Sequence, residues 1–196
     1  MSTLQFFTPE LKLENKSVLL RPTAMADFDV LKLIADPAIW EHTSTTLDNE
    51  EQFRCYLQNA LEERETKKRI PFTIIEKNTG QLIGNTSVGN ISWKNKRAEI
   101  GWTWMGKAFQ GKGYNKPMKF LLLQYLIEVA GFMRIEFRTR GTNLQSQKAL
   151  EKIGATREGV LRNHFVDGGI YYDMVYYSIL SGEWPAIKNS IFSSEL

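Results

Sequence analysis

The feature that most constrains this chain is a junction between two segments of different hydrophobic periodicity. Residues 99–105 alternate as a β-strand does, and residues 118–129 form an apolar run that is typical of a helix. The stretch "AFQGKGYNKP", residues 108–117, joins them. A strand that leads into an apolar helix predicts a crossover connection, because the helix has to bury its apolar surface against a sheet.

The flanking segments extend this pattern to the whole chain. Further strands are predicted at residues 17–23, 71–77, 82–93, 97–105, 134–140, 159–166 and 170–180. Helices are predicted at residues 26–37 and 118–129. A further helix is predicted to follow a capping box of Asp48 and Glu51, another to run from an Asn143 cap to Gly154, and a last one to start near Gly182. We therefore expect an α/β (α+β) fold in one domain, residues 1–196. Its sheet is mixed, twisted and mainly antiparallel, with about six to seven strands and helices on both faces.

Composition restricts the partners. The chain is 42% apolar and 24% charged, as globular proteins are, and a net charge of +3 is too small to indicate nucleic acid. Cys55 is the single cysteine, so no intrachain disulfide can form, which favours a reducing compartment. Residues 1–15 lack the apolar core of a secretory signal, and no apolar run is long enough to cross a bilayer. We expect a cytoplasmic monomer or homodimer that binds neither nucleic acid nor membrane.

The glycines of the junction suggest an anion site. N–H groups at the start of the following helix can bind phosphate with the help of the helix dipole. Gly111 and Gly113 let the backbone approach such a ligand, and Lys112 adds a positive charge. A turn that needs glycine for steric reasons alone explains the same residues. The junction lacks the glycine spacing before a Lys-Ser or Lys-Thr pair that marks a P-loop, and it lacks the third glycine of a dinucleotide fingerprint.

Three blocks together resemble a known family. The blocks are "AEIGWTWMGKAFQGKGYN", "NLQSQKALEKIGATREGVLR" and "YYDMVYYSILSGEW". They are similar to the GNAT superfamily of acetyl-CoA-dependent N-acetyltransferases, and within it to the ribosomal-protein N-terminal and spermidine-type branch. The likeness covers about residues 17–184 and implies the GNAT fold.

The resemblance assigns the junction to coenzyme A. The family's loop, Gln/Arg-x-x-Gly-x-Gly/Ala, carries the pyrophosphate and matches Gln110, Gly113 and Asn115, although Asn115 is larger than the usual residue. A related subset has Asn at this place and a lysine that matches Lys119, with Pro117 here in place of a glutamate. The coenzyme A contacts implied in this way are Trp102, Thr103, Trp104, Gln110, Gly111, Lys112, Gly113, Tyr114, Asn115, Lys119, Asn143 and Ser146.

The resemblance also implies catalytic roles. Glu99 is a possible general base, directly or through water, and Ser146 is a candidate acid for the leaving thiolate. Local structure can account for the same residues without catalysis: Glu99 as a surface strand residue paired with Arg97 or a neighbour, and Ser146 as an ordinary first-turn serine. Asn143 is both an N-cap and a pantetheine contact. Trp40 lies near the implied acceptor pocket or packs in the core, and Trp102 and Trp104 line either the core or the cofactor groove.

These assignments predict a transfer of acetyl to a primary amine by direct attack in a ternary complex, with acetyl-CoA as co-substrate and no metal. The alternative is a non-catalytic acyl-CoA-binding or sensing module. The acceptor stays open between a protein N-terminus, a polyamine, an aminoglycoside and an amino-acid-like amine. A modest acidic cluster, Glu41, Asp48, Glu50 and Glu51, weakly keeps polyamines among these possibilities. His42, His164 and Cys55 show no activating or metal-ligand spacing.

Overall fold

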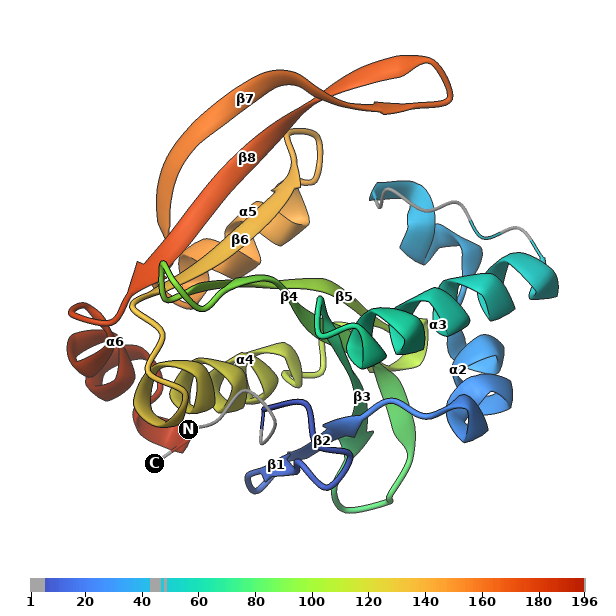
Figure 1. Ribbon diagram of the computed structural model, residues 1–196, viewed down its shortest axis with the longest axis horizontal. Helices are drawn as coiled ribbons and strands as arrows, with labels where there is room; N and C mark the ends of the chain where they lie inside the picture. The colour runs from blue at the N-terminus through green and yellow to red at the C-terminus, as the bar shows by residue number, and fades with distance from the viewer. Residues whose placement is uncertain (1–5, 43–46, 48, 196) are drawn as a thin grey trace.

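The computed structural model describes residues 6–42, 47 and 49–195, and within them the chain forms one eight-stranded sheet (Figure 1). The strand order is β1-β2-β3-β4-β5-β6-β8-β7, and every neighbouring pair is antiparallel except β5 and β6. The strands are β1 (Leu13–Glu14), β2 (Val18–Pro22), β3 (Ile70–Glu76), β4 (Leu82–Ser92), β5 (Arg97–Met105), β6 (Arg134–Arg140), β7 (Thr156–Asp167) and β8 (Ile170–Leu180).

Helices cover both faces of the sheet. The α-helices are α2 (Phe28–Ile34), α3 (Glu50–Glu65), α4 (Asn115–Gln124), α5 (Leu144–Lys152) and α6 (Trp184–Ile191). Short 3-10 turns are η1 (Met25–Asp27), η2 (Pro37–His42), η3 (Lys107–Phe109) and η5 (Ser193–Glu195), and η4 (Tyr125–Val129) is a π-helical turn. Two apolar clusters follow from this arrangement. One packs α2 and α3 against Trp104, and the larger one packs α4, α5 and α6 against the other face.

The predicted crossover is confirmed. α4 and η4 connect β5 to β6, which run parallel, and residues 117–123 of α4 are all buried. A helix that is buried on every side has a continuous apolar run as its sequence. This is why the segment was recognisable in the sequence.

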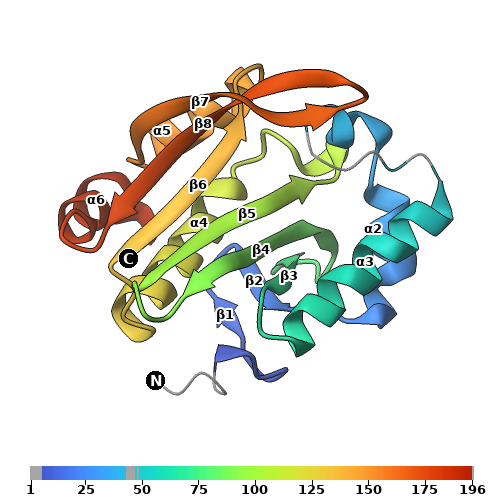
Figure 2. The same ribbon diagram turned by 45° about the horizontal axis from the view of Figure 1, so that its top comes forward.

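β5 and β6 pair over three residues only. Their register ends at Glu99↔Glu136, whereas β6 continues along β8 to Arg140 and β5 continues along β4 to Met105. Figure 2 shows the β5 and β6 ribbons diverging along their length. We call the region where β5 beyond Glu99 and β6 beyond Glu136 no longer pair the β5–β6 fork. Backbone groups along its two edges lack a ladder partner in the other strand and are therefore available to a ligand.

Several local predictions need correction. The sheet has an eighth strand because the two-residue β1 pairs with β2, and a segment so short carries no readable alternation. The N-cap of α3 is Asn49, whose side chain accepts from the Gln52 N–H, so the predicted Asp48 box is wrong, and Asp48 itself lies outside the described residues. The charge run "ERETKKR", residues 63–69, predicts a solvated helix end, but its last residue, Arg69, is buried with its Nε 2.6 Å from Glu63.

Candidate functional site

The edge of the fork on β5 carries a bulge. Asn85 pairs with Trp104 and Ser87 pairs with Gly101, so two steps along β4 oppose three along β5. Trp102 takes a φ of 51°, a strained value for a bulky residue that costs about 1–3 kcal/mol. A bulged residue is left out of the ladder. The bulge shifts the register of β5 against β4, and on its other edge β5 has no partner in β6 beyond Glu99, so backbone N–H groups that face the fork can donate to a bound oxygen.

The Trp102 ring stabilises the bulge from the α3 side. The Arg69 guanidinium lies over it at 4.9 Å, and the ring fills the space beside Gly89, where a Cβ would come within 2.7 Å of it. The alternative of core packing is supported for Trp104, because its ring is 5.5 Å from Trp40 inside the cluster of α2 and α3. Trp40 itself is buried there, and residues 43–46, which follow it near the implied acceptor pocket, lie outside the described part of the chain.

The glycine loop leads from β5 into α4. Gly111 and Gly113 have φ values of 73° and 90°, and a Cβ at either position would meet nothing within 4 Å. Glycine is therefore required there by the positive φ of the backbone and not by crowding from other protein atoms. Tyr114 caps α4 without a side-chain hydrogen bond, so the first N–H groups of the helix lack an intrahelical or capping partner. Gln110 Nε2 donates to the Met105 carbonyl at 3.0 Å and ties the loop back to β5.

Lys119 lies away from the loop where the sequence had grouped it. Its Nζ donates to Thr103 Oγ1 at 3.1 Å and lies 5.4 Å from the centre of the Phe137 ring. Thr103 is on β5 beyond Glu99 and Phe137 is on β6 beyond Glu136, so the amine lies within the β5–β6 fork. Burial lowers the pKa of Lys119 from 10.5 to about 7, and the charge of Glu99 opposes this shift only in part.

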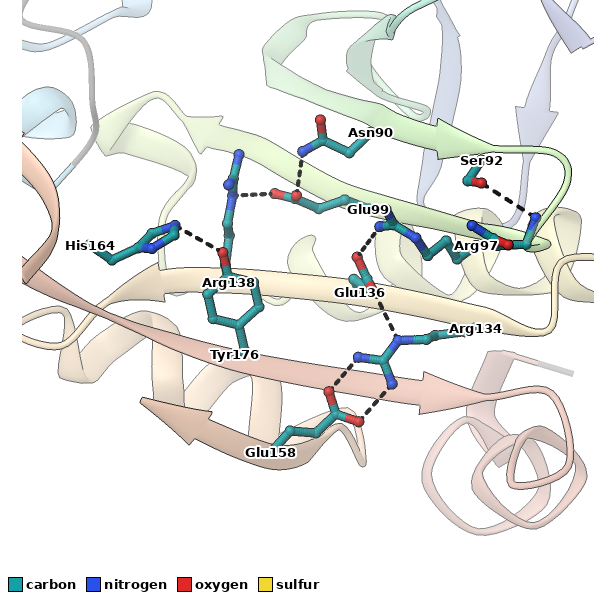
Figure 3. Close-up of polar contacts among 11 residues, drawn as sticks. Asn90, Ser92, Arg97, Glu99, Arg134, Glu136, Arg138, Glu158, His164 and Tyr176 are labelled. Carbon is teal, nitrogen blue, oxygen red and sulfur yellow. Dashed lines mark hydrogen bonds and ion pairs between the residues drawn. The ribbon is translucent and has the colours of Figure 1, made fainter. Parts of the chain in front are cut away.

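Glu99 is buried at 6% exposure and both of its oxygens are engaged (Figure 3). Oε2 accepts from Asn90 Nδ2 at 2.7 Å, and Oε1 accepts from Arg138 Nε at 3.0 Å. The alternative of a solvent-facing Glu99 paired with Arg97 is wrong, because Glu99 is buried and Arg97 pairs with Glu136 at 2.9 Å. Burial acts to lower the pKa of Arg138, but Glu99 and Tyr176 outweigh it and hold that pKa above its ordinary value.

The network reaches His164, a lone histidine with no activating spacing in the sequence. The Tyr176 hydroxyl lies 3.2 Å from His164 Nε2 (Figure 3). Tyr176 also interacts electrostatically with Arg138. β7 carries extra residues at this point, because Leu161 pairs with Met174 and Phe165 with Tyr172. Simple alternation along β7 therefore does not predict where His164 points. Figure 3 also shows a neighbouring ladder in which Glu136 and Glu158 are both held by Arg134.

The start of α5 forms the remaining side of the predicted site. Asn143 Oδ1 accepts from the Ser146 N–H at 2.9 Å, which confirms Asn143 as the N-cap. Gln147 Nε2 donates to the Gly141 carbonyl at 2.9 Å and fixes the loop between β6 and α5. The cap uses the amide oxygen of Asn143, which leaves its nitrogen for another acceptor.

Two findings concern other classes of site. Within residues 6–42, 47 and 49–195, no three His, Cys, Asp or Glu side chains gather in a way that could hold a metal ion. In the same residues, no helix combines the length and apolar character that a membrane span requires.

Comparisons with known proteins agree on one family. A family model described as an acetyltransferase (GNAT) domain matches residues 17–156. YdaF of Bacillus subtilis, named as a candidate ribosomal N-acetyltransferase, is 35% identical over 109 residues, which are 56% of this chain and 59% of YdaF, less than two thirds of its length. The uncharacterised N-acetyltransferase p20 of Bacillus licheniformis is 28% identical over 88% of this chain and 97% of its own.

Solved structures give the same fold. A GCN5-related N-acetyltransferase from Brucella melitensis superposes with a TM-score of 0.86 at 26% identity and covers 97% of this chain and 90% of its own. RimJ of Mycobacterium smegmatis, solved in complex with CoA-disulfide, has a TM-score of 0.79 at 22% identity, with 96% and 97% coverage. At that identity the RimJ likeness concerns the fold alone.

Proposed function

The chain belongs to the GNAT family of acetyltransferases, and from this premise we propose that it transfers acetyl from acetyl-CoA to a single primary amine, with a protein N-terminus as the acceptor. The observation that carries the proposal is the β5–β6 fork. It brings a bulge with unpaired backbone groups, a glycine loop at a helix N-terminus and a buried carboxylate network into one region.

The fork and its loop fit acetyl-CoA as co-substrate. The N–H groups at residues 111–115, with Lys112, would hold the pyrophosphate, because they combine the helix dipole with positive charge. Asn143 would hold the pantetheine arm from α5. Acetyl-CoA supplies an activated thioester, and the chain has to position the amine and stabilise the oxyanion. Backbone N–H groups at the Trp102 bulge are the donors we assign to the oxyanion.

Proton removal is assigned to water held by Glu99. A neutral amine is needed for attack, and a second proton is lost as the amide forms. Because Arg138 and Asn90 occupy both oxygens of Glu99, a relay through water suits this carboxylate better than direct capture. Ser146 is the proposed relay of a proton to the leaving sulfur.

The charges around the Glu99 network favour an acceptor with a single amine over a polyamine. Glu99, Glu136 and Glu158 are each paired with an arginine. In the described part of this face, these carboxylates are neutralised and do not form the acidic cluster that a polyamine requires. The relation to YdaF, named for a ribosomal acceptor, points in the same direction. The single cysteine supports a cytoplasmic site of action.

A thiol-release assay tests the proposal and its alternative. Acetyl-CoA is supplied with peptides that carry free or blocked N-termini, with spermidine and with an aminoglycoside. Thiol release that requires the free N-terminus supports the proposal, and the blocked peptide is the matched control. Faster transfer to spermidine would overturn the acceptor assignment. Tight acetyl-CoA binding without transfer to any amine would favour the non-catalytic acyl-CoA-binding module.

A further inference from the structure

We propose that the Lys119 ammonium is the counter-charge of the coenzyme A sulfur and stabilises the thiolate that leaves when acetyl is transferred. The proposal rests on the proposed function, because it needs the thioester to lie in the β5–β6 fork. It concerns a residue that the sequence had grouped with the phosphate loop.

The geometry places the amine between the two strands. Lys119 is 5% exposed on α4, and its Nζ reaches Thr103 on the β5 edge and lies near the Phe137 ring on the β6 edge. Thr103 directly follows the bulged Trp102, whose backbone we assign to the oxyanion. A thioester with its carbonyl at that bulge has its sulfur within the same fork, because the sulfur is bonded to the carbonyl carbon.

The protein satisfies only part of the hydrogen-bonding capacity of the Lys119 amine. An ammonium has three donors, and the hydrogen bond to Thr103 employs one of them. Within the described residues, no carboxylate lies within 4 Å of this Nζ. Residues 117–123 of α4 are buried, so water does not solvate the charge from the helix side. A buried ammonium without a paired anion is costly, and the arrangement is suited to an anion that arrives with the ligand.

Its electrostatic setting agrees with this role. Glu99, on β5, is the charged group of the described chain whose field reaches Lys119, and it favours the ammonium form. With a pKa of about 7, the amine is partly protonated at neutral pH, and an incoming thiolate would shift it further towards the ammonium.

The chemical step balances as follows. The acceptor nitrogen bonds to the acetyl carbon, the carbon–sulfur bond breaks, and its electron pair goes to sulfur. The proton lost by the nitrogen passes to the water held by Glu99 and on to solvent. Lys119 keeps its proton beside the thiolate. The proton that turns the thiolate into a thiol comes from solvent, with Ser146 as relay.

The test measures the ionisation of bound coenzyme A, without any turnover. The ultraviolet absorbance of the thiolate is followed against pH for coenzyme A, free and saturated with protein. With wild type, the bound thiol should ionise about one to three pH units below free coenzyme A. Lys119→Met should remove this displacement, whereas Lys152→Met, an exposed lysine on α5, should keep it.

The outcomes separate the two proposals. If wild type binds acetyl-CoA and coenzyme A but the bound thiol ionises as it does in solution, the role of Lys119 is overturned and the proposed function stands. If calorimetry shows that wild type does not bind acetyl-CoA, the proposed function fails first. The wild-type titration decides the question even where Lys119→Met does not fold, and acetyl-CoA binding by the variant reports whether it does.

Discussion

Replacing Lys119 by methionine should stabilise the fold, and by an amount that depends on pH. One pH unit of pKa displacement corresponds to about 1.4 kcal/mol, so a shift from 10.5 to about 7 costs the folded state about 5 kcal/mol when the pH is below 7. Methionine carries no charge to desolvate and fills a similar volume. It removes the hydrogen bond that the Lys119 amine donates to Thr103, which offsets the gain by about 1 kcal/mol.

The sign of the pH dependence follows from proton binding. Below pH 7 the folded and unfolded states both hold the proton on Lys119, and the full cost of burying the charge is present. Between pH 7 and 10.5 the folded state has released the proton while the unfolded state retains it, so the stability of wild type rises relative to Lys119→Met. The advantage of the variant should therefore be about 4 kcal/mol at pH 6 and about 1 kcal/mol at pH 9.

Urea unfolding at pH 6, 7, 8 and 9 measures this difference. Wild type and Lys119→Met are compared at each pH, with Lys152→Met as the control, since its lysine is exposed and its effect should not vary. A difference between wild type and Lys119→Met that stays constant from pH 6 to pH 9 would refute the reasoning. It would mean that the amine is solvated or paired in the folded protein.

Three further predictions address the site. Gly113→Val should weaken coenzyme A binding in calorimetry by at least tenfold, whereas Gly80→Val, at a glycine with a similar positive φ in the β3–β4 turn, should cost stability and leave the affinity intact. Ser146→Ala should lower turnover much more than it raises the KM for acetyl-CoA; unchanged thiol release removes Ser146 from the relay. Glu99→Gln should depress acetylation most at neutral pH and less at alkaline pH, where more amine is neutral, and a parallel pH–rate profile would point to acceptor binding.

The element order could be predicted because each element has a readable period. The apolar run of α4, the hairpin of β7 and β8 and the Asn143 cap all follow local rules, and the structure has them where expected. The bulge at Trp102 breaks such a rule. Ile100 packs in the same cluster as α4 and Thr103 contacts Lys119 of α4, although residues three apart in a regular strand face opposite sides.

The hydrogen-bond partners of Glu99 could not be predicted from the sequence, for a different reason. Arg138 is 39 residues away on β6, and it reaches Glu99 because β5 and β6 run parallel and then separate. Arg97 is two residues from Glu99 and was the nearer choice, but it pairs with Glu136. Which cation meets which carboxylate depends on the parallel register, and no local pattern reports that register.

The position of Lys119 is a signal in the sequence, because a lysine inside an apolar run implies a free-energy cost of burying its charge. A lysine inside the run "MKFLLL" contradicts the burial that its neighbours demand, since charged residues are almost never fully buried unless paired. Trp102 at positive φ and Glu99 in a buried network break local rules in the same way. All three lie at or beside the β5–β6 fork, while the regular parts of the sheet obey those rules. Because proteins keep such costs where function requires them, a variant that removes one should gain stability and lose part of the function together. For Lys119→Met the expected loss is the displaced ionisation of the bound coenzyme A thiol, while acetyl-CoA binding is kept. Lys119→Met tests both halves of that exchange in one protein.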